Sequence, residues 1–363
     1  MTLPEPLQQI DRTCVLSGRT KLSYFAGCDY FRLSSHPAVL KAASHAITEF
    51  GLNVAASRMT TGNHALYGRL ESRLAKFFKA ESALLVSNGY VTNLVVAQAL
   101  AGQFSHVLLD DKAHPSLKDA AAMFDCPVVP FKHRNLDDLV CAIRRCGPQS
   151  QIILLTDGMV AHDGWIAPLK TYLKLLPRNA FLLVDDAHGA GTLGKTGKGS
   201  IELEGVPRSR VIQTLTLSKA FGAYGGAVLC NRKLRNRIIA KSRLFVGSTP
   251  LPLPLAAAAL ESVNILDRGK ALRARLNQNV AHVKKALKKS GYPVLDNPSP
   301  IVAVTPQNAR SAKEIKQRCL KHGVFPSFIN YPGGPENGFF RFVISSEHSR
   351  AQLEALIASV IGK

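Results

Sequence analysis

The chain has 363 residues, of which 46% are hydrophobic and 20% are charged, a composition typical of a soluble globular protein large enough for more than one domain. No stretch approaches the roughly 18 consecutive apolar residues of a membrane helix, and the N-terminus lacks the basic and apolar regions of a secretory signal. Seven scattered cysteines without metal-ligand spacing predict free thiols, no metal site and a reducing, cytoplasmic location.

The formal net charge of +21 has two interpretations. One is binding to nucleic acid or to another anionic surface. The other is a basic surface suited to anionic substrates, such as coenzyme A thioesters or an acyl carrier protein. The densest basic runs, at 284–289 and 232–237, have the pattern of solvated helix faces. Because no aromatic residues alternate with the cations as base stacking requires, these features weigh against a nucleic-acid partner.

The N-terminal residues 1–45 predict a short segment with an extended stretch at 21–26 and the start of a helix at 36–50. A polar loop at 58–62 and a strongly patterned helix at 65–78 follow. Strands and helices then alternate. The predicted strands cover 82–87, 106–110, 128–131, 151–156, 180–184, 211–217 and 226–229, and the predicted helices cover 91–100, 116–123, 136–144 and 168–176.

Short, continuously apolar strands that alternate with helices predict an α/β fold with a mostly parallel sheet covered on both faces. The pattern changes after about residue 250. A long Ala/Leu-rich helix at 253–287 is followed by a strand at 301–305, a helix at 311–322 and a strand at 340–345. We therefore predict an N-terminal segment at 1–45, a large α/β domain at 46–250 and a small C-terminal α+β domain at 251–363.

Lys219 follows an apolar strand and enters a turn of small residues. Upstream, a second strand ends in Asp185 and Asp186, with His188 three residues after the first of them. Taken singly, aspartates after a strand are more often helix caps and a lysine is more often a surface charge. Together they predict pyridoxal phosphate (PLP) chemistry, in which the lysine binds the cofactor as a Schiff base. The acid then keeps the pyridine nitrogen protonated, so that the ring accepts electrons.

These motifs and their order are similar to those of the α-oxoamine synthases, PLP enzymes of fold type I. Members condense an amino acid with an acyl thioester and release CO2. The resemblance covers about 24–356 and rests on the stretches 29–37, 87–90, 185–189 and 194–199. It implies a homodimer with shared active sites, a large PLP-binding domain and a smaller C-terminal domain.

The resemblance also implies a role for each candidate site residue. The expected catalytic residues are Lys219, which removes the α-proton, Asp185 at the pyridine nitrogen, His188 at the phenolic oxygen and His114, stacked on the ring. Arg341 is expected to bind the carboxylate of the amino acid, because its guanidinium offers a fixed fork of donors. The expected phosphate contacts are Asn88, Gly89 and Tyr90 at a helix N-terminus, Thr216, and Ser248 and Thr249 reaching from the other subunit.

The chain departs from the family pattern at four positions. Ala161 stands where a serine hydroxyl is expected, Cys28 where asparagine is common, Tyr67 where histidine is usual and Asp157 where many members carry glutamate. These changes leave the PLP chemistry in place and bear on the choice of substrate.

The reaction that the resemblance favours joins L-alanine to pimeloyl-CoA or pimeloyl-acyl carrier protein and gives 8-amino-7-oxononanoate. Two alternatives use the same cofactor: glycine with acetyl-CoA, as in glycine C-acetyltransferase, or serine with a long acyl chain. An alternative of another class is a non-catalytic basic binding protein. The motifs leave the amino acid, the acyl chain and the carrier of the thioester open.

Overall fold

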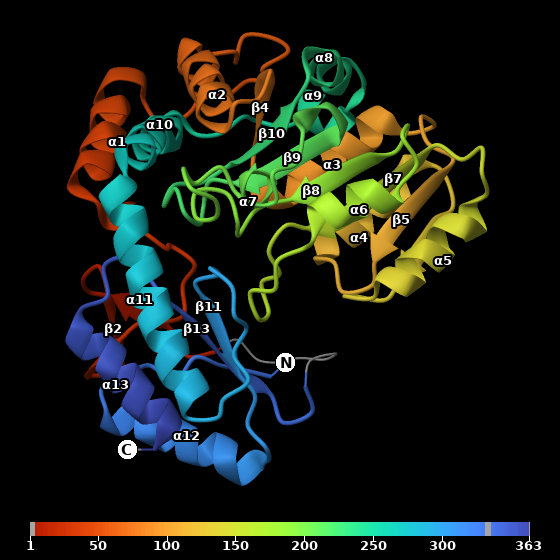
Figure 1. The fold of residues 1–363 in the computed structure, drawn as a ribbon. Helices are drawn as coiled ribbons and strands as arrows, with labels where there is room; N and C mark the ends of the chain where they lie inside the picture. Colours follow the sequence, from red (N-terminus) through yellow and green to blue (C-terminus); the bar gives the residue numbers. More distant parts are fainter. Residues whose placement is uncertain (1–3, 331–334, 363) are drawn as a thin grey trace. The chain divides into compact units, whose positions relative to one another are not determined.

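The computed structural model describes residues 4–330 and 335–362, which fold into two compact units (Figure 1). The smaller unit combines the N-terminal residues up to Ser35, Ala161–Trp165 and the residues from Gly269 onward. The larger unit combines His36–Val160 and Ile166–Arg268. This division differs from the predicted boundaries, because the N-terminal segment joins the C-terminal residues and the residues after 250 stay with the large unit as far as Arg268.

A seven-stranded sheet forms the centre of the larger unit, in the order β4-β10-β9-β8-β7-β5-β6. Neighbours from β9 to β6 are parallel, whereas β10 is antiparallel to both β4 and β9. The mostly parallel α/β sheet predicted from the sequence is therefore confirmed. The strands are β4 (Ser82–Val86), β5 (His106–Asp110), β6 (Val128–Phe131), β7 (Ile152–Asp157), β8 (Phe181–Asp185), β9 (Val211–Thr216) and β10 (Gly226–Cys230).

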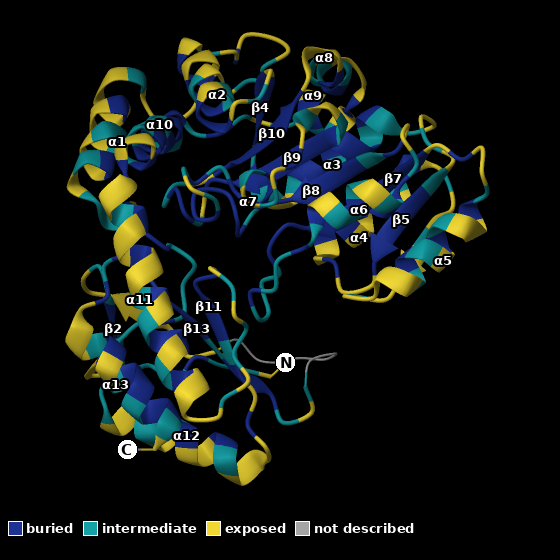
Figure 2. Cartoon of the chain, viewed as in Figure 1, coloured by how far each residue is buried: buried dark blue, intermediate teal, exposed yellow. Residues whose placement is uncertain are grey.

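Both faces of this sheet are buried except along the edge strand β6, which explains why most of its strands are rich in apolar residues. On β7, Ile153 and Leu155 pack into a core with α3 (Gly89–Leu100), while the alternate residue Leu154 is fully buried on the opposite face. Figure 2 shows the inner strands of the sheet, such as β7, β8 and β9, in the colour of buried residues. The sheet is thus a rigid base for the side chains at its strand ends.

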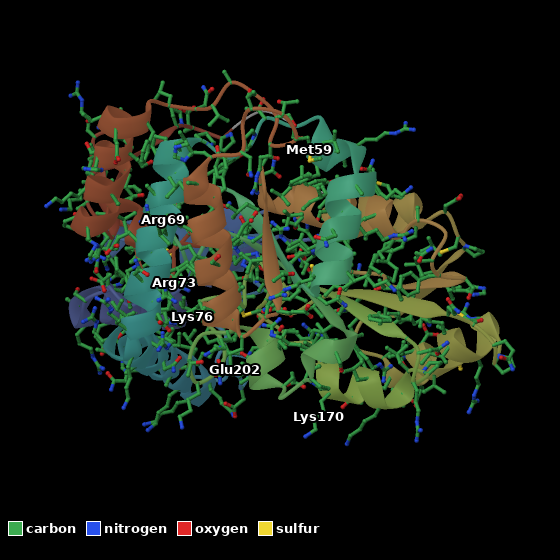
Figure 3. The ribbon with its side chains drawn as sticks, turned by 90° about the horizontal axis from the view of Figure 1, so that it is seen from above. Met59, Arg69, Arg73, Lys76, Lys170 and Glu202 are labelled. Carbon is green, nitrogen blue, oxygen red and sulfur yellow. The ribbon has the colours of Figure 1, made fainter. Side chains whose placement is uncertain are left out.

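Helices α1 (Pro37–Phe50) and α2 (Ala65–Phe78) both pack against α10 (Leu253–Arg268) in the larger unit. Figure 3 labels the cations Arg69, Arg73 and Lys76 on successive turns of α2. The other helices of this unit are α4 (Pro115–Ala121), α5 (Leu136–Cys146), α6 (Leu169–Leu175), α7 (Ser200–Leu203), α8 (Arg232–Lys241) and α9 (Arg243–Val246). Three short 3-10 turns cover Leu33–Ser35, Ala122–Phe124 and Arg208–Arg210.

The predicted single helix at 253–287 is wrong, because the chain breaks it at Gly269. Helix α10 ends at Arg268, and α11 (Lys270–Lys289) begins after Gly269. Glycine is a poor helix former because it loses the most backbone freedom on folding. The break also separates two packing environments: α10 contacts α1 and α2, whereas α11 packs against α13 (Arg350–Ile361) of the smaller unit.

Two three-stranded antiparallel sheets build the smaller unit. The bridge between Ser23 and Val324, and the hydrogen bond from Val343 N to Phe25 O (2.7 Å), tie the N-terminal segment to C-terminal residues. One sheet contains β1 (Leu7–Gln9), β2 (Cys14–Ser17) and β3 (Thr20–Ser23); the other contains β11 (Ile301–Val304), β13 (Phe339–Val343) and β12 (Phe328–Ile329), and α12 (Ala309–Lys321) packs on α13.

Within the described residues, no helix combines the length and the apolar character that crossing a bilayer requires.

Candidate active site

A cavity of about 290 Å³ lies where the parallel strands of the larger unit end. Strand β7 ends at Asp157, β8 at Asp185 and β9 at Thr216, and all three side chains line the cavity. Open α/β sheets bind ligands at this edge. The structure brings together eight of the predicted site residues around it, namely Asn88, Gly89, Tyr90, His114, Asp185, His188, Thr216 and Lys219.

One wall of the cavity is the N-terminus of the twelve-residue helix α3. Asn88 caps the helix, since its Oδ1 accepts a hydrogen bond from Val91 N at 3.2 Å. A Cβ on Gly89 would lie 2.6 Å from Cβ of Thr216, so only glycine lets the turn approach β9 this closely. The free N–H groups of the first helical turn, with the Thr216 hydroxyl beside them, form an anion-binding site.

A buried polar network holds Asp185 at the floor of the cavity. Its Oδ2 accepts from Asn93 Nδ2 at 2.7 Å, and its Oδ1 accepts from Ala187 N at 3.0 Å. Thr214 Oγ1 donates to Asn93 Oδ1 at 2.7 Å, which fixes the orientation of the amide. Because the side chain of Asp185 is held from behind, its carboxylate is pre-oriented toward a cationic group in the cavity.

His114 is held at the cavity by Asp157 and Ser116. Its backbone N donates to Asp157 Oδ2 at 2.9 Å, and its Nδ1 lies 2.8 Å from Ser116 Oγ. Burial lowers the pKa of His114; the charge of Asp185 opposes this shift and the charge of Lys219 adds to it. The ring is therefore neutral at physiological pH. Burial also raises the pKa of Asp157 well above its ordinary value, with a further contribution from the Asp185 charge.

Five residues of the site were missed as functional positions by the sequence reasoning: Asn93, Ser116, Asp157, Ser218 and Tyr224. Asn93 carries the clearest signal, since it lies four residues after Gly89 on the same buried helix face. A polar residue on a buried face needs a hydrogen-bond partner, and here the partner is Asp185. Of the other four, Ser116 lies in the first turn of α4, and Asp157, Ser218 and Tyr224 lie in turns or at a strand end, where polar residues are common.

Three predicted site residues lie outside this cavity. Ser248 and Thr249 line a separate small hollow beside Tyr67 and Phe245, so their phosphate contact stays a prediction that requires a second subunit. Arg341 belongs to the smaller unit, where its Nη1 donates to Ala161 O at 3.3 Å and its Nη2 lies 3.9 Å from Cys28 Sγ.

Asp186, the residue after Asp185, has a structural role. It is fully buried and accepts from Ser200 N at 3.0 Å and from Gln213 Nε2 at 2.6 Å. Burial raises the pKa of Asp186 from 3.8 to about 7, although these hydrogen bonds oppose the shift. It does not line the cavity, which separates its role from that of its neighbour.

The raised pKa of Asp186 predicts a pH dependence of stability. Between about pH 4 and 7 the folded protein retains a proton that the unfolded chain has lost, so the free energy of unfolding falls as the pH rises. We expect the stability of the wild type relative to Asp186→Asn to decrease across this window, by on the order of 1–3 kcal/mol. Urea denaturation of both proteins at several pH values checks this, and a constant difference would contradict it.

The cavity has the groups that PLP requires. Its size and its strand-end position suit a small ring, and the α3 N-terminus offers donors for a phosphate. Asp185 offers an acceptor for a protonated ring nitrogen, and Lys219 brings a primary amine to the same space. His114 adds a flat, neutral ring. When bound, PLP supplies an electron sink for a carbanion, a property that none of the side chains has.

Comparison with known proteins agrees with this fit. The family model of aminotransferase class I and II matches residues 27–360. The chain is similar to 8-amino-7-oxononanoate synthases of Trichlorobacter lovleyi (32% identity, covering 98% of this chain and 92% of that protein) and Thioalkalivibrio sulfidiphilus (34%, 95% and 89%). Its structure is similar to a serine palmitoyltransferase variant from S. paucimobilis with a bound PLP–myriocin aldimine (TM-score 0.92, 26% identity, covering 99% and 92%). The chain therefore belongs to the aminotransferase class I and II family and, within it, to the α-oxoamine synthases, which are PLP-dependent acyltransferases of fold type I.

Proposed function

We propose that the protein condenses L-alanine with a pimeloyl thioester and releases CO2, the thiol and 8-amino-7-oxononanoate. The observation that carries the proposal is its similarity, over nearly the whole chain, to curated relatives that bear the name of this activity. The pimeloyl group is carried by coenzyme A or by an acyl carrier protein, and the net charge of +21 suits both anionic donors.

Lys219 is the group we assign to proton transfer. It is only partly buried and lies in the same cavity as Asp185 and His114. In the proposed reaction its Nζ anchors the cofactor and, once released, takes the α-proton of the amino acid. Asp185 would hold the ring nitrogen of PLP protonated, and His114 would lie against the ring of the cofactor. The cavity thereby gathers the groups that the reaction needs.

Arg341 is the group we assign to the carboxylate of the amino acid. Its Nε is buried without a hydrogen-bond partner among the described residues, and Nη1 reaches only a backbone oxygen. A buried guanidinium N–H without an acceptor is costly, and a bidentate carboxylate would satisfy it. Cys28 lies beside Nη2 of Arg341, at the position where asparagine is common in the family. Its sulfur is a weaker hydrogen-bond acceptor than an amide oxygen.

The proposed enzyme is a cytoplasmic homodimer. Seven free cysteines are consistent with a reducing compartment. Ser248 and Thr249 would complete the phosphate site of the partner subunit, which is why dimerisation is part of the proposal. The second candidate function uses serine and a long acyl chain, and the similarity to a serine palmitoyltransferase structure favours it over the glycine-using alternative.

The test combines purified protein and PLP with matched substrate pairs: L-alanine with pimeloyl-CoA, L-serine with palmitoyl-CoA, and glycine with acetyl-CoA. Free thiol is followed with a chromogenic disulfide, and the product is identified by mass. We expect thiol release and a mass of 8-amino-7-oxononanoate with the first pair. Activity only with serine or glycine would replace the proposal with the corresponding alternative.

A further inference from the structure

A second cavity, of about 270 Å³, lies in the larger unit where β7, β8 and β9 begin. It is lined by Gln151 before β7, by Phe181 at the first position of β8 and by Val211 at the first position of β9. The active-site residues Asp157, Asp185 and Thr216 end the same three strands. The second cavity therefore opens at the opposite edge of the sheet, and we call it the strand-start pocket.

Apolar side chains form part of the lining of the strand-start pocket, next to uncharged polar residues. Phe104 and Phe181 meet edge to face with ring centroids 6.0 Å apart. Ile212 and Leu234, both buried, complete this apolar part of the lining. The volume is near the lower end of the range for small-molecule sites, about 300–1,000 Å³. A short aliphatic chain or a single ring would fill it.

The rim of the strand-start pocket is cationic. Arg208, Lys233 and Arg237 line it, and no aspartate or glutamate does so. Lys233 is exposed, whereas Arg208 and Arg237 are half-buried. Arg208 donates one hydrogen bond to the side chain of Gln213, and Arg237 donates one to the backbone oxygen of Ala99. Three cations beside this apolar part of the lining are complementary to an anionic head on a short apolar body.

A chain of hydrogen bonds leads from this pocket to the active site. Arg208 Nη2 donates to Gln213 Oε1 at 2.8 Å, and Gln213 Nε2 donates to Asp186 Oδ2 at 2.6 Å. Gln213 and Asp186 are fully buried, and Asp186 directly follows Asp185, which lies at the floor of the catalytic cavity. The positive charge of Arg208 and the charge of Asp186 act on each other across this chain. An anion at Arg208 would weaken that interaction.

We propose that the strand-start pocket binds a small amphipathic carboxylate, and that Arg208, Gln213 and Asp186 transmit its binding to the cofactor site. The occupant is distinct from the substrates, because it binds at the other edge of the sheet. The proposal goes beyond the acyl transfer and does not depend on which amino acid or thioester the enzyme uses.

The experiment titrates holoenzyme with octanoate by calorimetry, with octanamide as the uncharged counterpart. We expect saturable binding of octanoate, and binding weakened about tenfold in Lys233→Glu and in Arg208→Gln. Lys241→Glu, an equal charge change at an exposed position on the same helix outside the pocket, should bind as the wild type does. Equal binding by Lys233→Glu and the wild type, or equal affinity for octanamide, would overturn the site.

The effect of the strand-start pocket on the cofactor site is tested with the same samples, by measuring the absorbance of bound PLP as a function of pH. Octanoate should shift the midpoint of this titration in the wild type and in Lys241→Glu, but not in Arg208→Gln at saturating octanoate. Binding without a shift in the wild type would overturn the transmission. If L-alanine or pimeloyl-CoA displaces octanoate competitively, octanoate binds in the active site. Such competition would overturn the whole proposal.

Discussion

Replacement of Lys219 by alanine should reduce acyl transfer by at least about 10³-fold, because it removes the only amine that lines the catalytic cavity among the described residues. The variant should still bind PLP, since the α3 N-terminus and Asp185 are unchanged. It should not retain PLP covalently after borohydride reduction and denaturation. Thiol release measures the first effect, and the mass of the peptide that contains residue 219 measures the second.

The matched control for this change is Lys170→Ala. Lys170 is exposed at the start of α6 and does not line the cavity, and Figure 3 shows it at the edge of the molecule. We expect it to keep wild-type activity and covalent PLP. If Lys219→Ala retained PLP covalently, another lysine would be the anchor and the assignment of Lys219 would fail.

The second large effect is expected for Asp185→Asn, which should lower kcat by about 10²–10³-fold. The amide has nearly the shape of the carboxylate but no negative charge to hold the ring nitrogen protonated. It also turns an acceptor into a donor at a place where Asn93 Nδ2 and Ala187 N both donate. Steady-state kinetics check the loss, and the absorbance of bound PLP checks the change in ring protonation.

Asp186→Asn is the control, because Asp186 is the adjacent carboxylate and does not line the cavity. We expect its kcat to remain within about fivefold of the wild type, since its main effect is on stability. Comparable losses of kcat in the two variants would mean that the loss in Asp185→Asn is not specific to the carboxylate that lines the cavity.

The sequence predicted most of the larger unit because its signals are local. The strands at 106–110 and 128–131 and the helix at 65–78 have the predicted bounds, since apolar runs or a helical repeat end there at polar or glycine residues. The break at Gly269 was missed because the Ala/Leu-rich pattern continues on both sides of it. Helix α13 was also missed, although Ser349 and Gln352 form the capping box that marks its start.

The candidate site was predicted where its residues belong to motifs. Lys219, Asp185, His188 and Asn88 stand at strand ends or helix starts, and the parallel sheet gathers such positions at one edge. Asn93 and Ser116 were missed because their partners depend on how α3 and α4 pack over the sheet, which no local pattern encodes. The strand-start pocket was missed for the same reason, as its lining comes from five separate stretches of chain.

The way the chain divides between the two units limits which parts of the protein can be expressed separately. The polypeptide passes from one unit to the other at residues 35/36, 160/161, 165/166 and 268/269, and the short excursion Ala161–Trp165 is closed at its base by the bridge between Met159 and Ile166. Neither unit is therefore encoded by one continuous stretch of the gene. A coding sequence shortened to 36–268 would carry the whole larger unit with only the excursion Ala161–Trp165 added, whereas the smaller unit cannot be cut from the gene as one piece.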